Sequence, residues 1–217
     1  MRLEKENFEE AVKKAIENKK ERKFEQSLEM IITLKNIDLK KPENRVKLQI
    51  TLPKGRGKEL PIALIADTLI YEKGKELLGQ ENVYTKEDIL KLHEQGKNKL
   101  KKLAKKYYWF IIKADLMKTL GPVIMPVLGP RSKIPQVVAV EQQLEPMINK
   151  LKNTIRVNSK MNPLLQAPIG TEKMSPEDLT ENAIHVYRTI VDSLPQKELN
   201  VGKVYLKFSM SPSVEVK

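Results

Sequence analysis

The residues with the clearest chemical character form a short basic loop. Lys54, Arg56 and Lys58 alternate with two glycines, directly after a run of alternating apolar residues. Lysine and arginine bind phosphate groups, and glycine lets a backbone approach its ligand closely. The loop lacks the G-x-x-x-x-G-K-[ST] nucleotide-binding pattern, and Leu60 stands where G-x-G-x-x-G needs its third glycine. We therefore expect a mobile turn or a contact with a phosphate backbone, not a nucleotide site.

Other residue types that carry out catalysis lack companions. His93 and His185 fall on predicted helices, and neither has a metal-binding partner at the required spacing. Asp67 and Asp115 each follow a predicted strand, where catalytic acids often lie in open α/β sheets. We predict no catalytic residue, no metal site, no cofactor and no enzyme activity. The alternative is an α/β enzyme that binds a nucleotide or small ligand beside Asp67 or Asp115.

The composition favours a polyanionic partner. The 217 residues include 40 basic and 28 acidic side chains, giving a net charge of +12, and 40% are hydrophobic. That hydrophobic fraction is sufficient for packed cores and excludes a fully disordered basic chain. A basic protein of this kind most often binds nucleic acid. Further basic clusters at residues 19–23 and 97–106 are also consistent with solvated helix faces.

Several classes of protein are excluded. The chain has no cysteine, which rules out disulfides and thiol catalysis. No apolar run approaches the ~20 residues that a membrane-spanning helix needs. Residues 1–20 lack the apolar core of a signal peptide. We expect a cytoplasmic protein without a membrane partner.

The helices and strands that must position the basic loop follow one pattern at the two ends of the chain and another in the middle. The ends predict a helix over 8–16, strands over 28–34 and 46–52 that pair antiparallel, a helix from Ser175 and a last strand over 204–208. Residues 161–170, which contain proline, are predicted to be an extended connection that precedes the helix from Ser175. The middle predicts buried strands at 61–66 and 107–114 separated by helices, typical of a parallel sheet. Four prolines and two glycines within 121–135 argue against regular structure there.

These patterns predict an α/β protein of two domains. Residues 1–58 and 156–217 are expected to form a split α+β domain. Residues 59–155 form an inserted three-layer α/β domain with a Rossmann-like parallel sheet. The chain crosses between them twice, near 58–60 and 154–156, which would make a hinge.

The aromatic residues indicate which kind of RNA the chain would bind, single-stranded or folded. One Trp, six Tyr and four Phe fall mostly within apolar patterns. A stacking platform for single strands needs several exposed aromatics on one sheet face. Recognition of folded RNA through phosphates and 2′-hydroxyls fits better. The small polar residues 209–213 around Met210 suit close backbone approach, although Met210 could equally belong to the core.

Five segments in order resemble one known family over essentially the whole chain. They are KFEQSLE at 23–29, LPKGRGK at 52–58, LGPR at 128–131, APIGT at 167–171 and VYLKFSMSPSV at 204–214. They are similar to the archaeal form of the ribosomal protein L-one family. The resemblance implies a two-domain protein of the large ribosomal subunit, whose split domain, residues 1–58 and 156–217, binds large-subunit rRNA to form the mobile stalk. It also implies release of deacylated tRNA from the exit site and repression of translation through the protein's own mRNA.

The resemblance also implies site residues. Phe24 and Ser27 match the family's first RNA-contact segment, and Ser209, Met210 and Ser211 its second, where relatives usually have Thr-Met-Gly. Ser211 therefore adds a Cβ where backbone meets RNA. With the basic loop, the expected RNA-binding set is Phe24, Ser27, Lys54, Arg56, Lys58, Ser209, Met210 and Ser211. Arg131 and Lys133 are expected to contact tRNA.

The expected state is a monomer when free and ribosome-associated otherwise. A general basic RNA chaperone, which would bind unrelated structured RNAs alike, is a further alternative.

Overall fold

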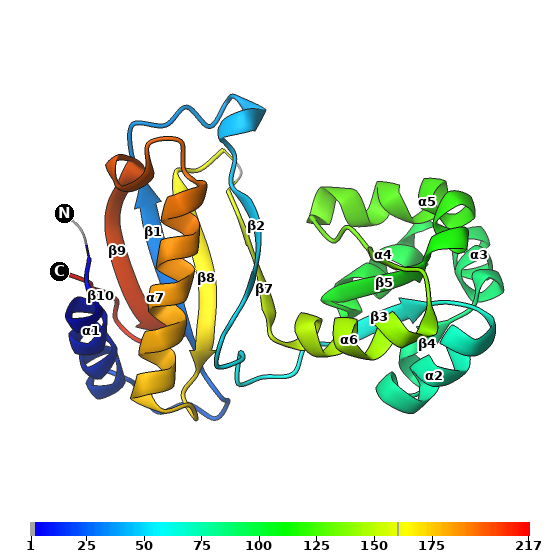
Figure 1. Cartoon of the computed structure of the whole chain (residues 1–217), viewed down its shortest axis with the longest axis horizontal. Helices are drawn as coiled ribbons and strands as arrows, with labels where there is room; N and C mark the ends of the chain where they lie inside the picture. Colours follow the sequence, from blue (N-terminus) through cyan, green and yellow to red (C-terminus); the bar gives the residue numbers. More distant parts are fainter. Residues whose placement is uncertain (1–2, 160) are drawn as a thin grey trace. The chain divides into compact units, whose positions relative to one another are not determined.

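The computed structural model describes residues 3–159 and 161–217, which form two compact units (Figure 1). The split unit contains the chain up to Lys58 and from Lys152 onward, and the inserted unit is Glu59–Leu151. Residues 152–155, assigned to the insert from sequence, thus belong with the split unit. In the described residues, no helix is long and apolar enough to cross a membrane.

The main sheet of the split unit is antiparallel. Its strands are β1 (Ser27–Leu34), β8 (Leu164–Thr171), β9 (Val201–Phe208) and β10 (Val214–Glu215), in the order β10-β9-β1-β8. Every second residue of β1 is buried, as its alternating sequence predicts. Helices α1 (Lys5–Glu17) and α7 (Pro176–Ser193) pack against each other and cover this sheet; the rings of Phe8 and Tyr187 lie 5.3 Å apart.

A second, two-stranded sheet corrects the expected pairing. β2 (Lys47–Thr51) pairs antiparallel with β7 (Thr154–Asn158), not with β1. Both edges of β1 are occupied, by β8 and β9. The prediction of a β1–β2 pair was wrong because alternation shows which face of a strand is buried, not which strand lies beside it.

Residues 161–170, expected to be an extended connection, instead supply most of strand β8 of the main sheet. Pro168 is tolerated because β8 is an edge strand and the register shifts at its β1 partners, between Leu28 and Glu29. A proline at an edge or bulge removes no ladder hydrogen bond that a neighbour needs.

The inserted unit has a parallel sheet between two helical layers, which confirms the mixed α/β fold. Strands β3 (Ile62–Ile65), β4 (Val83–Tyr84), β5 (Trp109–Lys113) and β6 (Gln136–Val138) lie in the order β4-β3-β5-β6. One core holds Ala63, Phe110 and the inner faces of α3 (Lys86–Glu94), α4 (Lys97–Lys106) and α5 (Ala114–Leu128). The other holds Leu64, Trp109 and the helices α2 (Thr68–Leu78) and α6 (Leu144–Lys152). Short 3₁₀ helices are η1 (Pro42–Asn44), η2 (Gln80–Asn82), η3 (Gly129–Arg131), η4 (Glu141–Gln143) and η5 (Lys197–Asn200).

Helices α5 and η3 overturn the prediction of no regular structure for residues 121–131, whereas residues 132–135 lie outside any helix or strand, as predicted. Helix α5 continues through Pro122 and Pro126 to Leu128. The two prolines are four residues apart and both are exposed, whereas Leu120 and Ile124 are buried. Proline has no N–H, so the backbone carbonyl four residues before each proline loses its helical hydrogen bond. Because both prolines lie on the exposed side of α5, these carbonyls can bind water instead, and burial of the apolar stripe offsets the lost helix stability.

Candidate nucleic-acid interface

One end of the main sheet exposes two large apolar side chains. A turn closes after β9, in which the Ser211 N–H donates to the Phe208 carbonyl at 3.0 Å. Met210 projects from this turn and is 54% exposed, so it is not a core residue. Phe24, just before β1, is 53% exposed. The Ser209 N–H donates to the Ser27 carbonyl at 3.1 Å, which holds the two segments side by side.

We name Phe24, Ser27, Ser209 and Met210 the Phe24–Met210 surface. Gln26, a buried residue that was not predicted from the sequence, holds this surface in place, and we call its hydrogen bonds the frame of the surface. The Gln26 side chain accepts a hydrogen bond from the Met210 N–H at 3.1 Å and donates to the Lys20 carbonyl at 2.6 Å. Its backbone N–H donates to a Glu172 carboxylate oxygen at 3.1 Å, and its carbonyl accepts from the Glu172 N–H. Every polar group of Gln26 is thus used to join three chain segments.

Ser211 lies behind this surface instead of on it. Its side chain is buried, and its Oγ accepts a hydrogen bond from the Lys20 N–H at 3.1 Å. The hydroxyl therefore fixes the segment that follows α1. The Cβ that a glycine would lack is accommodated inside the protein, so it does not obstruct the exposed face.

Some basic side chains around the surface form ion pairs with carboxylates, and others do not. Lys19 pairs with Glu172 at 2.9 Å, and Lys173 pairs with Glu25 at 3.0 Å. Hydrogen bonds from Lys19 and the Gln26 N–H lower the pKa of Glu172, and the Lys173 ammonium beside the Glu25 carboxylate lowers the pKa of Glu25. Arg22 and Lys23 are exposed and occur in none of the ion pairs of the described residues. Their charge is available to an anionic partner.

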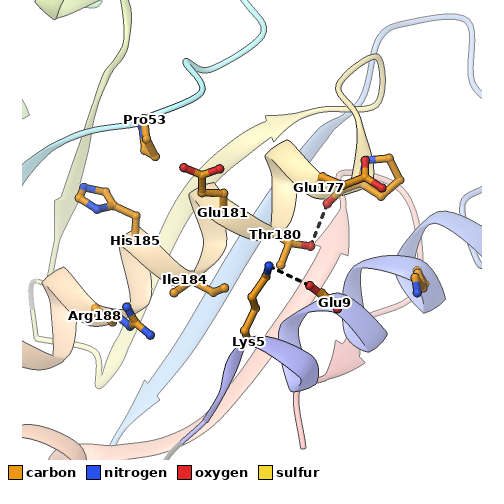
Figure 2. Close-up of a pocket in the computed structure, with 11 residues that line it drawn as sticks. Lys5, Glu9, Pro53, Glu177, Thr180, Glu181, Ile184, His185 and Arg188 are labelled. Carbon is orange, nitrogen blue, oxygen red and sulfur yellow. Dashed lines mark hydrogen bonds and ion pairs between the residues drawn. The ribbon is translucent and has the colours of Figure 1, made fainter.

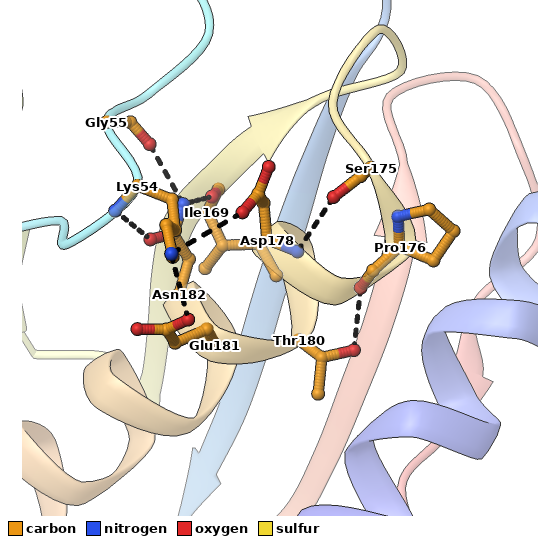
Figure 3. A network of polar contacts seen from close by, with 9 residues as sticks. All are labelled: Lys54, Gly55, Ile169, Ser175, Pro176, Asp178, Thr180, Glu181 and Asn182. Carbon is orange, nitrogen blue, oxygen red and sulfur yellow. Dashed lines mark hydrogen bonds and ion pairs between the residues drawn. The ribbon is translucent and has the colours of Figure 1, made fainter.

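The basic loop is divided between two environments. Figure 3 shows the first of them, around Lys54. Lys54 lies against the first turns of α7, where its Nζ is 3.4 Å from Glu181 and 3.9 Å from Asp178. Buried Asn182 accepts from the Lys54 N–H at 3.1 Å and donates to the carbonyls of Gly55 and Ile169. The loop is therefore fastened to α7 rather than mobile. Lys54 has partners of opposite charge.

The far end of the loop approaches the surface. Gly57 has a φ of +74°, and a Cβ there would lie 2.7 Å from the Thr171 Oγ1. Thr171 pairs with Ser27 across β1 and β8. Lys58 is exposed, and its charge helps to lower the pKa of Glu25 after the larger effect of Lys173. Arg56 is partly buried. Lys58 thus flanks the Phe24–Met210 surface, whereas Lys54 is directed elsewhere.

Arg131 and Lys133 serve the inserted unit itself. Arg131 donates to the Val127 carbonyl at 2.7 Å. The Lys133 Nζ donates to the carbonyls of Ala104 at 2.7 Å and Tyr107 at 2.5 Å, at the C-terminal end of α4. Both cations therefore stabilise ends of helices in this structure.

The carboxylates named for an enzyme form ion pairs. Asp67 and Asp115 lie beside the carboxyl ends of β3 and β5, where the Lys113 Nζ is 2.5 Å from Asp67 and 3.7 Å from Asp115. The hydrogen bond to Asp67 raises the pKa of Lys113. Both acids are partly or largely exposed and share a cation. This arrangement offers neither a general base nor a metal site, and the described residues hold no cluster of three potential metal ligands.

A groove of about 590 Å³ lies elsewhere, along α1 and α7 (Figure 2). Basic and acidic side chains both line this groove, and on its wall the Lys5 Nζ lies 3.4 Å from a Glu9 carboxylate oxygen. His185 also lines it, on exposed helix surface. His93 lies on α3 in the other unit.

Comparison with known proteins decides the family. Residues 12–212 match the model of the ribosomal protein L1p/L10e family. The chain belongs to the ribosomal protein L1p/L10e family. It is 44% identical to the large ribosomal subunit protein uL1 of Pyrococcus abyssi, over all of this chain and 98% of that protein. It is 41% identical to uL1 of Methanothermobacter thermautotrophicus, over 95% of this chain and 97% of that protein.

Membership of the L1p/L10e family confirms the resemblance seen in the sequence. It is a family of ribosomal proteins, not of enzymes, so the nucleotide-binding enzyme is rejected as an alternative. The match includes both segments of the Phe24–Met210 surface and the basic loop.

Proposed function

We propose that the split unit binds a folded segment of large-subunit rRNA through the Phe24–Met210 surface. The observation that carries this proposal is a pair of exposed apolar side chains held on a fully hydrogen-bonded frame. Exposed apolar residues rimmed by polar groups mark interaction sites. The neighbouring Arg22 and Lys23 supply the positive charge that an RNA backbone requires.

Each residue type has a distinct part in this mechanism. Arg22, Lys23 and Lys58 neutralise phosphates, which gives salt-dependent affinity. Phe24 and Met210 exclude water from the centre of the contact, where interface energy concentrates. The hydroxyls of Ser27 and Ser209 suit the 2′-hydroxyls of a folded RNA. Gln26 and Ser211 hold the two segments in place before RNA binds, so less ordering is needed on association.

The wider role follows from family membership. The chain is a ribosomal protein of the large subunit. We propose that it works in the cytoplasm, associated with the ribosome, and is a monomer when free. In this proposal it forms the mobile stalk, represses translation by binding a similar fold in its own mRNA, and helps to release deacylated tRNA from the exit site. The two chain crossings, at 58/59 and 151/152, would act as the hinge. Contacts of Arg131 and Lys133 with tRNA would require each to exchange a carbonyl partner for a phosphate.

A competition assay tests the rRNA proposal. The full chain is titrated with a fragment of large-subunit rRNA that carries the stalk-base junction, against a scrambled RNA of equal length, at two salt concentrations. We expect a preference of ~10³ or more that survives moderate salt. Equal affinities that are lost together as salt rises would support the general RNA chaperone and overturn specific rRNA binding.

A further inference from the structure

Helix α4 of the inserted unit carries an unusual concentration of charge. Six of its ten residues are lysine and none is acidic, so α4 alone accounts for half of the net charge of +12. All six lysines are exposed, while Leu100 and Ala104 face the core. At 100° per residue, the lysines and Asn98 occupy the entire solvent-facing arc of a helix about 15 Å long. The lysines are Lys97, Lys99, Lys101, Lys102, Lys105 and Lys106.

No carboxylate compensates this charge within the described chain. None of the ion pairs among the described residues includes a lysine of α4. The neighbouring helices α3 and α5 do carry acids. Asp88 caps α3 by accepting from Thr85, and Asp115 pairs with Lys113. Glu87 and Glu94 of α3 are exposed, and neither occurs in an ion pair with α4 among the described residues. Lys133 adds another ammonium group at the C-terminal end of α4.

The arrangement is unfavourable for the stability of the free helix. Lys97, Lys101 and Lys105 follow one another at four-residue intervals, where like charges repel. Lys97 and Lys99 also lie in the first turn, at the positive end of the helix dipole. By contrast, α3 and α7 place acids in their first turns. Lys105 and Lys106 lie in the last turn, where a cation is favourable to the helix dipole. Helix stability does not account for the first-turn lysines or for the four-residue repeat, whereas a polyanion lying along α4 would relieve both repulsions.

We propose that the exposed face of α4 binds the phosphate backbone of a double-helical RNA, as a second RNA contact separate from the Phe24–Met210 surface. The choice of RNA over other polyanions rests on the proposed function of the chain. A lipid surface fits less well because the apolar side of α4 is buried in the core and cannot insert into a bilayer. A-form RNA is recognised mainly through its phosphates and 2′-hydroxyls, so this contact needs no base-reading side chains.

The test uses full-length protein and a short RNA duplex of arbitrary sequence that lacks the stalk-base junction. One variant combines Lys101→Gln, Lys102→Gln and Lys105→Gln. The matched control combines Lys35→Gln, Lys40→Gln and Lys41→Gln, which removes the same charge from exposed positions of the split unit. We expect the α4 variant to bind the duplex about tenfold more weakly or worse, with a salt slope smaller by roughly 2–3. The control should change affinity by about twofold at most, and the melting temperature of the α4 variant should not fall.

Other outcomes overturn the proposal. Equal losses in the two variants would show that only net charge matters. Unchanged duplex binding by the α4 variant, together with loss of binding to phosphatidylserine vesicles, would assign α4 to a membrane surface instead. The same variants are assayed with the junction-bearing rRNA fragment against its scrambled control. A preserved preference there, with no effect on the duplex, would overturn the α4 contact alone and leave the rRNA proposal standing.

Discussion

Replacing Phe24 and Met210 together by alanine is expected to weaken binding to the rRNA site by about 2–5 kcal/mol. Both side chains are more than half exposed in the free protein, so their truncation removes little packing. In the complex they would exclude water from the serine hydroxyls and backbone groups between them. The melting temperature should therefore stay nearly constant while the dissociation constant rises. Isothermal titration with the rRNA fragment and a thermal melt measure the two quantities.

A matched variant separates this effect from general loss of apolar surface. Met161 and Leu199 are 62% and 68% exposed and belong to the same unit. They lie toward the opposite end of the sheet, near where β8 and β9 begin. Met161→Ala with Leu199→Ala should leave rRNA affinity unchanged. If both double variants bind like the natural chain, or both lose the same amount, the Phe24–Met210 surface is not the binding site.

Gln26→Ala is expected to lower the free energy of unfolding by about 2–3 kcal/mol and also to weaken rRNA binding. The substitution removes a fully buried side chain and leaves the partly buried Met210 N–H and Lys20 carbonyl without their partner. The turn that presents Met210 would then lose its tie to β1. Denaturant unfolding measures the first effect, and titration at a temperature where the variant is folded measures the second.

Gln49→Ala provides the control, since Gln49 is exposed on β2 of the same unit. It should change neither stability nor affinity by a measurable amount. A folded Gln26→Ala variant that keeps full rRNA affinity would show that the frame around Met210 is not needed for recognition.

Elements whose signals are local could be predicted from the sequence. Ser175, which accepts from the Asp178 N–H at 3.1 Å, begins α7 as its capping residues predicted. The alternating residues of β1 and the apolar strands of the inserted unit also form as expected. These features depend on neighbours a few residues away, so the sequence contains the information needed to predict them.

The missed features depend on distant partners. A buried glutamine and an exposed one look alike in a sequence. Two of the residues that bind Gln26, Met210 and Glu172, lie far along the chain. Lys54 belongs to a basic run, but its partners Asp178 and Glu181 come from α7. Pro122 and Pro126 suggested a break in α5 because their exposure could not be inferred from composition.

Hydrogen–deuterium exchange of the full chain, with and without the junction-bearing rRNA fragment, tests the central claim most directly. It reports which backbone segments the RNA covers, without any substitution. We predict slower exchange on binding in residues 22–27 and 209–213, and no change along the groove between α1 and α7. Unchanged exchange in both segments, at RNA concentrations that saturate the protein, would contradict the assignment of the Phe24–Met210 surface as the rRNA-binding site.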